Sequence, residues 1–475
     1  MKASKYRIGI LHAVIIISVL VTWGCGQKDD SDQNAKQHAV LPGGISGSEI
    51  NGNVTVQVID AMSALPLEKA SVFLQSINPE TFILESETNA QGFAIFRDER
   101  LTRPVCITVS CCSDEAYDTF SFFDVSTDMV VVPIILRKSP SVTRTEIFLD
   151  NINDTGNTIT FYINQPYNEK ITPVSSASKF ALNRYRMRLP ATPLSLAAVM
   201  TTSDGIPTHW MVNSFYKSPP SSTTPLTMSM RSIDKSDTKV STGKLSCEPA
   251  NLLSHNSPWD PLMNYSIDVF MEKGLAGLCR CGISHIYSDL RFETEAWKPP
   301  DNENITLRLT AVSSDSDQAA FTMAYLRYPH DQLPKDVVFK LKNIPTSLNV
   351  KPATTTQNPV LYWKSDSVSL QCITIQNRHF DYDWHIFLPG DKRNFVMPSV
   401  PLGNAGFLIP GESYTAAVEA YTIPDFDYRN FSLNALQQNI THWTRSESCI
   451  LIIPEIPGIE RADVTESTDI SVFPE

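Results

Sequence analysis

The chain has little of what a nucleic-acid-binding protein requires. Its 475 residues include 39 Lys and Arg against 51 Asp and Glu, a formal net charge of −12. Basic surfaces neutralise phosphates, so this balance argues against nucleic acid as a partner. Only 19% of the residues are charged and 32 are proline. Such a composition disfavours long helices and favours an extracellular, all-β chain.

Common catalytic and metal-binding motifs are also missing. None of the nine histidines is followed three residues later by glutamate, and neither His-Glu-x-x-His nor Gly-x-Ser-x-Gly occurs. These motifs are the local parts of zinc sites and of nucleophile turns. We therefore expect no enzyme activity, no cofactor and no resident metal. A secreted enzyme with an unrecognised site is the alternative.

A long apolar run covers residues 8–21, and Lys2, Lys5 and Arg7 precede it. A basic segment followed by a short apolar core is typical of a secretory signal peptide. The run of 14 residues is shorter than the roughly 18 needed to span a bilayer. We assign residues 1–25 to this signal.

The signal ends in Gly24-Cys25, which resembles the lipobox of bacterial lipoproteins. In that family the cysteine is acylated and becomes the first residue after cleavage. Trp23 departs from the family's preference for a small residue. The resemblance implies that Cys25 is a lipidation site and that the membrane is a partner through the lipid anchor. Gly26 stands where Asp would resemble an inner-membrane retention signal, so the outer membrane or cell surface is expected; the alternative is ordinary secretion.

Two polar segments flank the remaining chain. Residues 26–50 are polar and lack apolar periodicity, so they are expected to form a flexible linker. Residues 454–475 are rich in Asp and Glu and are expected to form an acidic disordered tail. Between them, alternation of apolar residues predicts tandem β-sandwiches.

Residues 51–138 alternate as strands and carry turn residues at fixed places. They resemble the carboxypeptidase regulatory-like domain, a transthyretin-like Greek-key sandwich. The matching positions are Asp60, Pro66, Leu67, Ala70, Val72, Thr88, Asn89, Gly92, Phe93, Tyr117 and 134–136. The resemblance implies a fold and no activity. A zinc carboxypeptidase domain often accompanies such a domain, but the His-x-x-Glu pair that its zinc site needs does not occur in this sequence.

Residues 139–345 are again strand-like and are expected to form one or two β domains. In residues 346–453, Leu408 to Ala420 resemble the fibronectin type III signature around Tyr414, which implies an Ig-like sandwich with a tyrosine corner. The whole chain is therefore predicted to be a multidomain all-β protein.

Four groups of residues could carry chemistry. Cys279 and Cys281 with His285 are soft zinc ligands, but the spacing is not that of a zinc finger, so they are expected to be strand residues. Residues 150–156 have the oxygen density of a calcium loop without its ligand alternation, so a hairpin turn is expected. The acidic pairs at 315–317 and 381–383 match a calcium loop no better.

Cysteines and tryptophans leave two questions open. Without Cys25 eight cysteines remain, which could be buried thiols or disulfides. Five tryptophans could pack in cores or form a sugar-stacking platform: Trp210, Trp259, Trp297, Trp384 and Trp443. We expect a lipid-anchored, non-enzymatic scaffold at the cell surface, with a surface protein or glycan as a further partner. An adhesin or carbohydrate-binding protein is the alternative.

Overall fold

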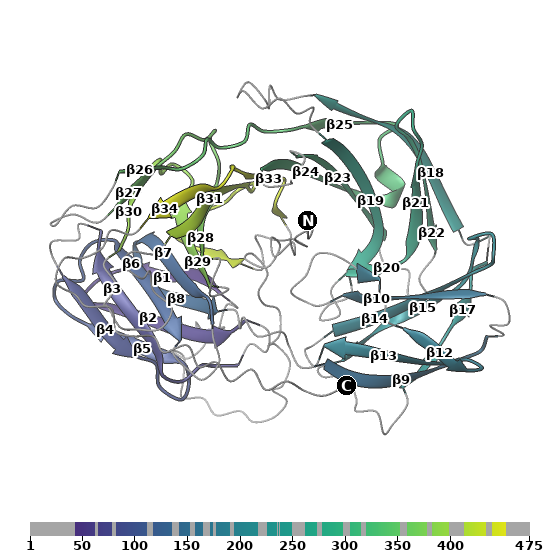
Figure 1. The fold of residues 1–475 in the computed structure, drawn as a ribbon, viewed down its shortest axis with the longest axis horizontal. Coiled ribbons are helices and arrows are strands. Elements are labelled where there is room, and N and C mark those ends of the chain that lie inside the picture. Colours follow the sequence, from purple (N-terminus) through teal and green to yellow (C-terminus); the bar gives the residue numbers. More distant parts are fainter. Residues whose placement is uncertain are drawn as a thin grey trace, which may run out of the picture.

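The protein is all-β, as predicted. The computed structural model describes residues 43–452 except 62–64, 78–81, 112–116, 135–141, 153–156, 165–171, 174–176, 191–193, 217–225, 235, 237, 249–261, 273–277, 298–304, 315–319, 352–358, 378–381, 399–412 and 434–438. Strands β1 to β34 and one short 3-10 helix, η4 (His330–Gln332), make up its regular structure. They form four sandwiches along an arc (Figure 1).

The first sandwich contains the strands expected within residues 51–138. One sheet has the order β1 (Gly44–Glu49), β8 (Thr127–Ile134), β2 (Asn53–Asp60), β5 (Phe93–Arg97). The facing layer has the order β7 (Thr119–Val125), β6 (Val105–Cys111), β3 (Ala70–Ser76), β4 (Ile83–Glu87). Val56, Val109 and Phe122 are fully buried between them. Inward-facing apolar residues from both layers thus build one core.

The turn between β4 and β5 shows why the sequence folds as it does here. The Thr88 hydroxyl donates to one backbone carbonyl at 2.6 Å and accepts from a backbone N–H at 2.9 Å. The Asn89 side-chain oxygen accepts two further backbone N–H groups, each at 3.0 Å. Gly92 has a φ of +75°, and a Cβ there would lie 2.5 Å from the Val58 carbonyl oxygen. Only glycine fits that position without strain.

Residues 139–345 contain two sandwiches, each with its own core. The second sandwich has two facing sheets. One sheet has the order β12 (Ser178–Ala181), β13 (Arg184–Pro190), β9 (Val142–Asp150), β16 (Leu226–Ser229). The other has the order β11 (Thr172–Pro173), β10 (Thr158–Asn164), β14 (Leu194–Thr201), β15 (Pro207–Tyr216), β17 (Arg231–Ser232). The third sandwich also has two facing layers. One layer has the order β21 (Gly282–Ile286), β22 (Arg291–Trp297), β18 (Thr238–Glu248), β25 (Asp336–Lys340). The other has the order β20 (Leu278–Arg280), β19 (Leu262–Glu272), β23 (Ile305–Ser314), β24 (Phe321–Pro329). Trp210 and Trp297 join the two cores, with ring centroids 5.6 Å apart.

The fourth sandwich lies within residues 346–453. A small sheet of β26 (Asn349–Lys351), β27 (Val360–Tyr362) and β30 (Asn394–Val396) covers β29 (Tyr382–Pro389), β28 (Leu370–Asn377), β31 (Ser413–Thr422) and β34 (Cys449–Ile452). Trp363, Trp384 and Tyr414 are buried in its core. Tyr414 of the fibronectin-like signature is buried, and residues 408–412 of that signature lie outside the described residues.

One continuous sheet passes through three of the four sandwiches. Its order is β20-β19-β23-β24-β33-β31-β28-β29-β7-β6-β3-β4, where β33 covers His442–Arg445. The strand β33 bridges the third and fourth sandwiches, and the parallel pair β29–β7 bridges the fourth and the first. Hydrogen-bonded sheet therefore crosses the predicted boundaries at 138 and 345.

Two expectations about local structure are corrected. Gly44–Glu49, assigned to the flexible linker, forms β1 because its backbone pairs with both β8 and β32 (Phe431–Ser432). The hairpin expected across residues 150–156 is wrong, because β9 and β10 lie in different sheets. Ile147 and Phe161 are inward-facing and buried, so the two strands pack face to face across the sandwich.

Several predicted segments lie outside the described residues. They are the signal peptide with Cys25, most of the linker, the tail at 454–475 and the acidic pair at 315–317. In the part of the chain that is described, no helix has the length and hydropathy to cross a bilayer. Six cysteines are thiols and not disulfide partners: Cys106, Cys111, Cys247, Cys281, Cys372 and Cys449.

Candidate functional site

Buried polar side chains gather where the first and fourth sandwiches join. There β7 and β29 run side by side and parallel, with Thr119 opposite Trp384 (Figure 1). Side chains alternate along a strand, so Asp383 and His385 share one face of β29. Asp118, directly before β7, lies beside them. Residues more than 260 positions apart in the sequence thus meet at one point.

Asp118, Asp383 and His385 place their ligand atoms within 4.8 Å of one another. The His385 Nε2 lies 3.8 Å from Asp118 Oδ2, and the Asp383 backbone N–H donates to Asp118 Oδ1 at 3.4 Å. His385 is 3% exposed and Asp118 is 7% exposed, whereas Asp383 is partly exposed. One imidazole and two carboxylates are a ligand set that divalent cations accept.

Cys372 on β28 adds a thiol next to this group. Burial by itself lowers the pKa of His385, but the Asp118 carboxylate and Cys372 outweigh it and raise the pKa to about 10. Burial raises the pKa of the Cys372 thiol. Cysteine, histidine and aspartate are the residues of a nucleophilic site, yet a reactive cysteine needs exposure and a low pKa. Cys372 is 0% exposed and has neither property, so this arrangement does not favour nucleophilic catalysis.

A second buried polar group lies on the neighbouring strands β31 and β33. Glu419 and Arg445 are directly opposite each other in the sheet, and Arg445 Nη1 donates to Glu419 Oε1 at 2.8 Å. The other carboxylate oxygen accepts from the Tyr421 hydroxyl and, at 3.2 Å, from Trp443 Nε1. Glu419 is 1% exposed and Arg445 is 5% exposed. Their contacts are internal, which indicates a structural role.

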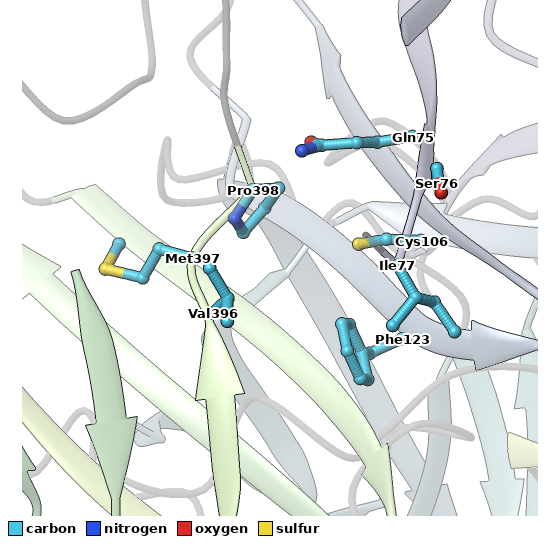
Figure 2. A pocket seen from close by; sticks show the side chains of 8 residues that line it. All are labelled: Gln75, Ser76, Ile77, Cys106, Phe123, Val396, Met397 and Pro398. Atoms are coloured by element: carbon cyan, nitrogen blue, oxygen red, sulfur yellow. The ribbon is translucent and has the colours of Figure 1, made fainter. Parts of the chain in front are cut away.

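A shallow pocket opens between the first and fourth sandwiches (Figure 2). Its lining comes from β3 and β6 on one side and from residues 396–398 on the other, and the Gln75 side chain points across it. Gln75 Oε1 is buried and has no hydrogen-bond partner in the described part of the chain. The empty volume is about 200 Å³, including space open to solvent. Ligand pockets are typically about 300–1,000 Å³, so this one suits water better than an organic ligand.

The zinc candidate at Cys281 and His285 is not brought together by the fold. Cys281 is 0% exposed in the third core, whereas His285 is exposed on β21 and packs against Tyr287 at 4.5 Å between ring centroids. The side chain of Cys279 lies outside the described residues. Cys279 lies in β20 and His285 in β21, as expected for strand residues, whereas Cys281 lies between these two strands.

The tryptophans proposed for sugar stacking are core residues where the structure describes them. Trp210, Trp297, Trp384 and Trp443 are between 1% and 7% exposed. Trp384 also donates from Nε1 to Ser121 Oγ at 2.9 Å, across the junction of the first and fourth sandwiches. These four indoles do not form a surface platform. Trp259 lies outside the described residues.

Sequence reasoning passed over the group at Asp118, Asp383 and His385. It tested the acidic pair at 381–383 as a calcium loop, in which ligands follow one another in a turn. The available signal was different: Asp383 and His385 are two positions apart in a strand, which puts both on one face. Their partner Asp118 has no local signature, because only the long-range pairing of β7 with β29 brings it there.

Comparisons with known proteins leave the family open. No protein-family model matches the sequence, and no curated protein matches it. One solved structure, the Bacillus anthracis TIE protein, is 9% identical with a TM-score of 0.16, and the match covers 62% of this chain and 50% of that chain. The BSP domain of a biofilm associated protein is 10% identical with a TM-score of 0.13, covering 93% of this chain and 100% of that chain. Likeness at these TM-scores supports no conclusion about function.

Proposed function

We propose that the protein is a lipid-anchored envelope scaffold, held to the membrane through Cys25 and presenting a rigid arc of β-sandwiches. The observation that carries the proposal is the Gly24-Cys25 pair at the end of a signal-like apolar run. Acyl chains on one cysteine provide stable anchoring when two or more are attached. The large sandwich region beyond it supplies surface for a protein or glycan partner.

The continuous sheet supports the scaffold part of the proposal. Separate sandwiches on flexible linkers would move independently. Here β33 and the pair β7–β29 join three sandwiches by backbone hydrogen bonds, and the Trp210–Trp297 contact packs the second against the third. A body built in this way keeps these sandwiches at fixed orientations relative to one another.

The anchor is tested by changing Cys25→Ala in cells labelled with palmitate. We expect loss of label and release of the protein from the membrane fraction. Cys449→Ala is the matched control, because it removes a partly buried thiol far along the chain and leaves the signal intact. Unchanged labelling and fractionation of Cys25→Ala would contradict the anchor. Equal release of both variants would point to misfolding instead.

A further inference from the structure

The outer sheet of the second sandwich carries positive charge that stands out in this acidic chain. Strands β12, β13, β9 and β16 contain four arginines and one lysine against two acidic residues, Glu146 and Asp150, whereas the whole chain has a net charge of −12. This sheet lies at one end of the arc (Figure 1), and the sandwich contacts the third one through Trp210 of its other sheet. The contact with the third sandwich therefore does not account for the charge.

The arginines occupy the outward positions of β13 and β9. Arg184, Arg186 and Arg188 alternate with residues that are buried in the core of the second sandwich. Arg144 on β9 is exposed, as are Arg184 and Arg188, and Arg186 is partly exposed. Because strand side chains alternate between the two faces of a sheet, these guanidinium groups share one solvent-exposed face.

Two of these arginines are like charges that face each other. Arg144 and Arg188 are directly opposite in the antiparallel ladder. Neither has an ion-pair partner in the part of the chain that the structure describes. Like charges at such positions destabilise a ladder. A bound carboxylate would remove the repulsion, because a guanidinium group donates two parallel hydrogen bonds to it.

The centre of the face combines an ion pair with an aromatic ring. Arg186 Nη2 lies 2.5 Å from Glu146 Oε1, and the same guanidinium lies 4.5 Å from the centroid of the Phe180 ring. Phe180 is 43% exposed. Sugar rings pack against such side chains, because their C–H groups meet the negative face of the aromatic system. Arg184 lies roughly 14 Å from Arg188 along the strand, at about 3.4 Å per residue, so positive charge is present on both sides of this centre.

We propose that this face binds an acidic polysaccharide. The pair Arg144–Arg188 holds one carboxylate, Arg184 holds another, and a sugar ring between them packs against Phe180. A chain with repeated acid groups reaches both positive ends at once, so its linked contacts strengthen one another. The glycan is then a partner of the envelope scaffold; the inference rests on that proposed function for its cellular setting, and not for the binding itself.

The test is calorimetric titration of the full-length protein in detergent with polygalacturonate oligosaccharides of graded length. We expect affinity to rise with chain length and to fall with added salt, which screens exposed charges. The double variant Arg144→Gln with Arg188→Gln should bind at least about 10-fold more weakly, since one hydrogen bond to a charged group is worth about that factor. Its thermal unfolding midpoint should be no lower than the parent's, because two repelling charges are removed. Loss of binding is thereby distinct from loss of folding.

A matched control removes the same charge elsewhere. Arg291→Gln with Lys340→Gln alters two exposed cations of the third sandwich and should bind as the parent does. Phe180→Leu removes the ring, keeps an apolar side chain, and should weaken binding by about 2- to 10-fold, the value of an aromatic contact.

Four outcomes would each overturn the proposal. They are no binding by the parent, equal weakening in the two double variants, equally tight binding of polyglutamate, and binding of phosphatidylglycerol vesicles in place of polygalacturonate. The last two would assign the face to acidic peptides or to a membrane surface. Cys25→Ala should bind the oligosaccharides as the parent does, so failure of the anchor and failure of this site are measured separately.

Discussion

The buried pair Glu419–Arg445 allows the strongest quantitative prediction. The two side chains are 2% and 6% exposed and are 2.8 Å apart. Removing one member of a buried ion pair leaves an uncompensated charge and costs about 3–5 kcal/mol of unfolding free energy. Glu419→Gln leaves the buried Arg445 guanidinium without a negative partner, so we expect the unfolding free energy to fall by an amount in that range.

Two further variants separate charge from hydrogen bonding. Tyr421→Phe deletes one donor to the carboxylate and should cost roughly 1.5–3 kcal/mol, the value for a hydrogen bond to a charged group. The double change Glu419→Met with Arg445→Met replaces both charges by apolar groups of similar length. Because no charge is then left unpaired, it should be less destabilising than Glu419→Gln alone.

The assay is equilibrium unfolding in urea, followed by tryptophan fluorescence with Trp443 as a local reporter, since its Nε1 donates to Glu419. The four sandwiches can unfold in steps, so the transition that includes Trp443 is the one to compare. The reasoning fails if Glu419→Gln shifts that transition by less than about 1 kcal/mol. It also fails if the double variant is more destabilised than the single one.

Three other variants test local features. Gly92→Ala should destabilise by more than Gly205→Ala, because both residues have positive φ (+75° and +79°) but only the first places a Cβ against backbone, at 2.5 Å; chemical denaturation of both measures the difference. Trp384→Phe removes the hydrogen bond to Ser121 and should cost about 1 kcal/mol, with the loss confined to the transition that separates the first and fourth sandwiches. His330 has its pKa lowered, first by burial and then by a nearby lysine. At this histidine the folded state therefore binds a proton less readily than the unfolded state. Its contribution to the free energy of unfolding is fully present above the usual pKa of 6.5 and is lost as the pH drops through the lowered pKa. Between pH 7.5 and 5, His330→Gln should therefore lose less unfolding free energy than the parent, and an identical loss would exclude His330 as the cause.

Strands were predictable where apolar residues alternate with polar ones. Residues 51–138 and 139–345, which were expected to be strand-like, contain β2 to β8 and β9 to β25. Local turn chemistry was predictable too, because Asn89 and Gly92 use only nearby backbone. Both features depend on short-range sterics and hydrogen bonds, which residues close together in the sequence determine.

Sheet partners were not predictable in the same way. The apolar alternation in β9 and β10 is compatible with a hairpin in one sheet and equally with two strands that pack face to face from different sheets. In the structure the two strands lie in different sheets. The parallel pairing of β7 with β29 joins residues far apart in the sequence, so no local sequence pattern predicts it. The group at Asp118 and His385 depends on that pairing and was missed with it.

The buried charges at these junctions explain how separate sandwiches join in one register. Along β31, Tyr414, Ala416 and Val418 face the core of the fourth sandwich, and Glu419 faces the other side. A slip of one residue would turn Glu419 into that apolar core and away from Arg445, since strand side chains alternate with period two. The cost of an unpaired buried carboxylate excludes this alternative, whereas slipping an apolar residue into another apolar environment costs far less. The polar pair therefore selects the register at which β31 and β33 join, and through β33 it determines how the third sandwich attaches to the fourth.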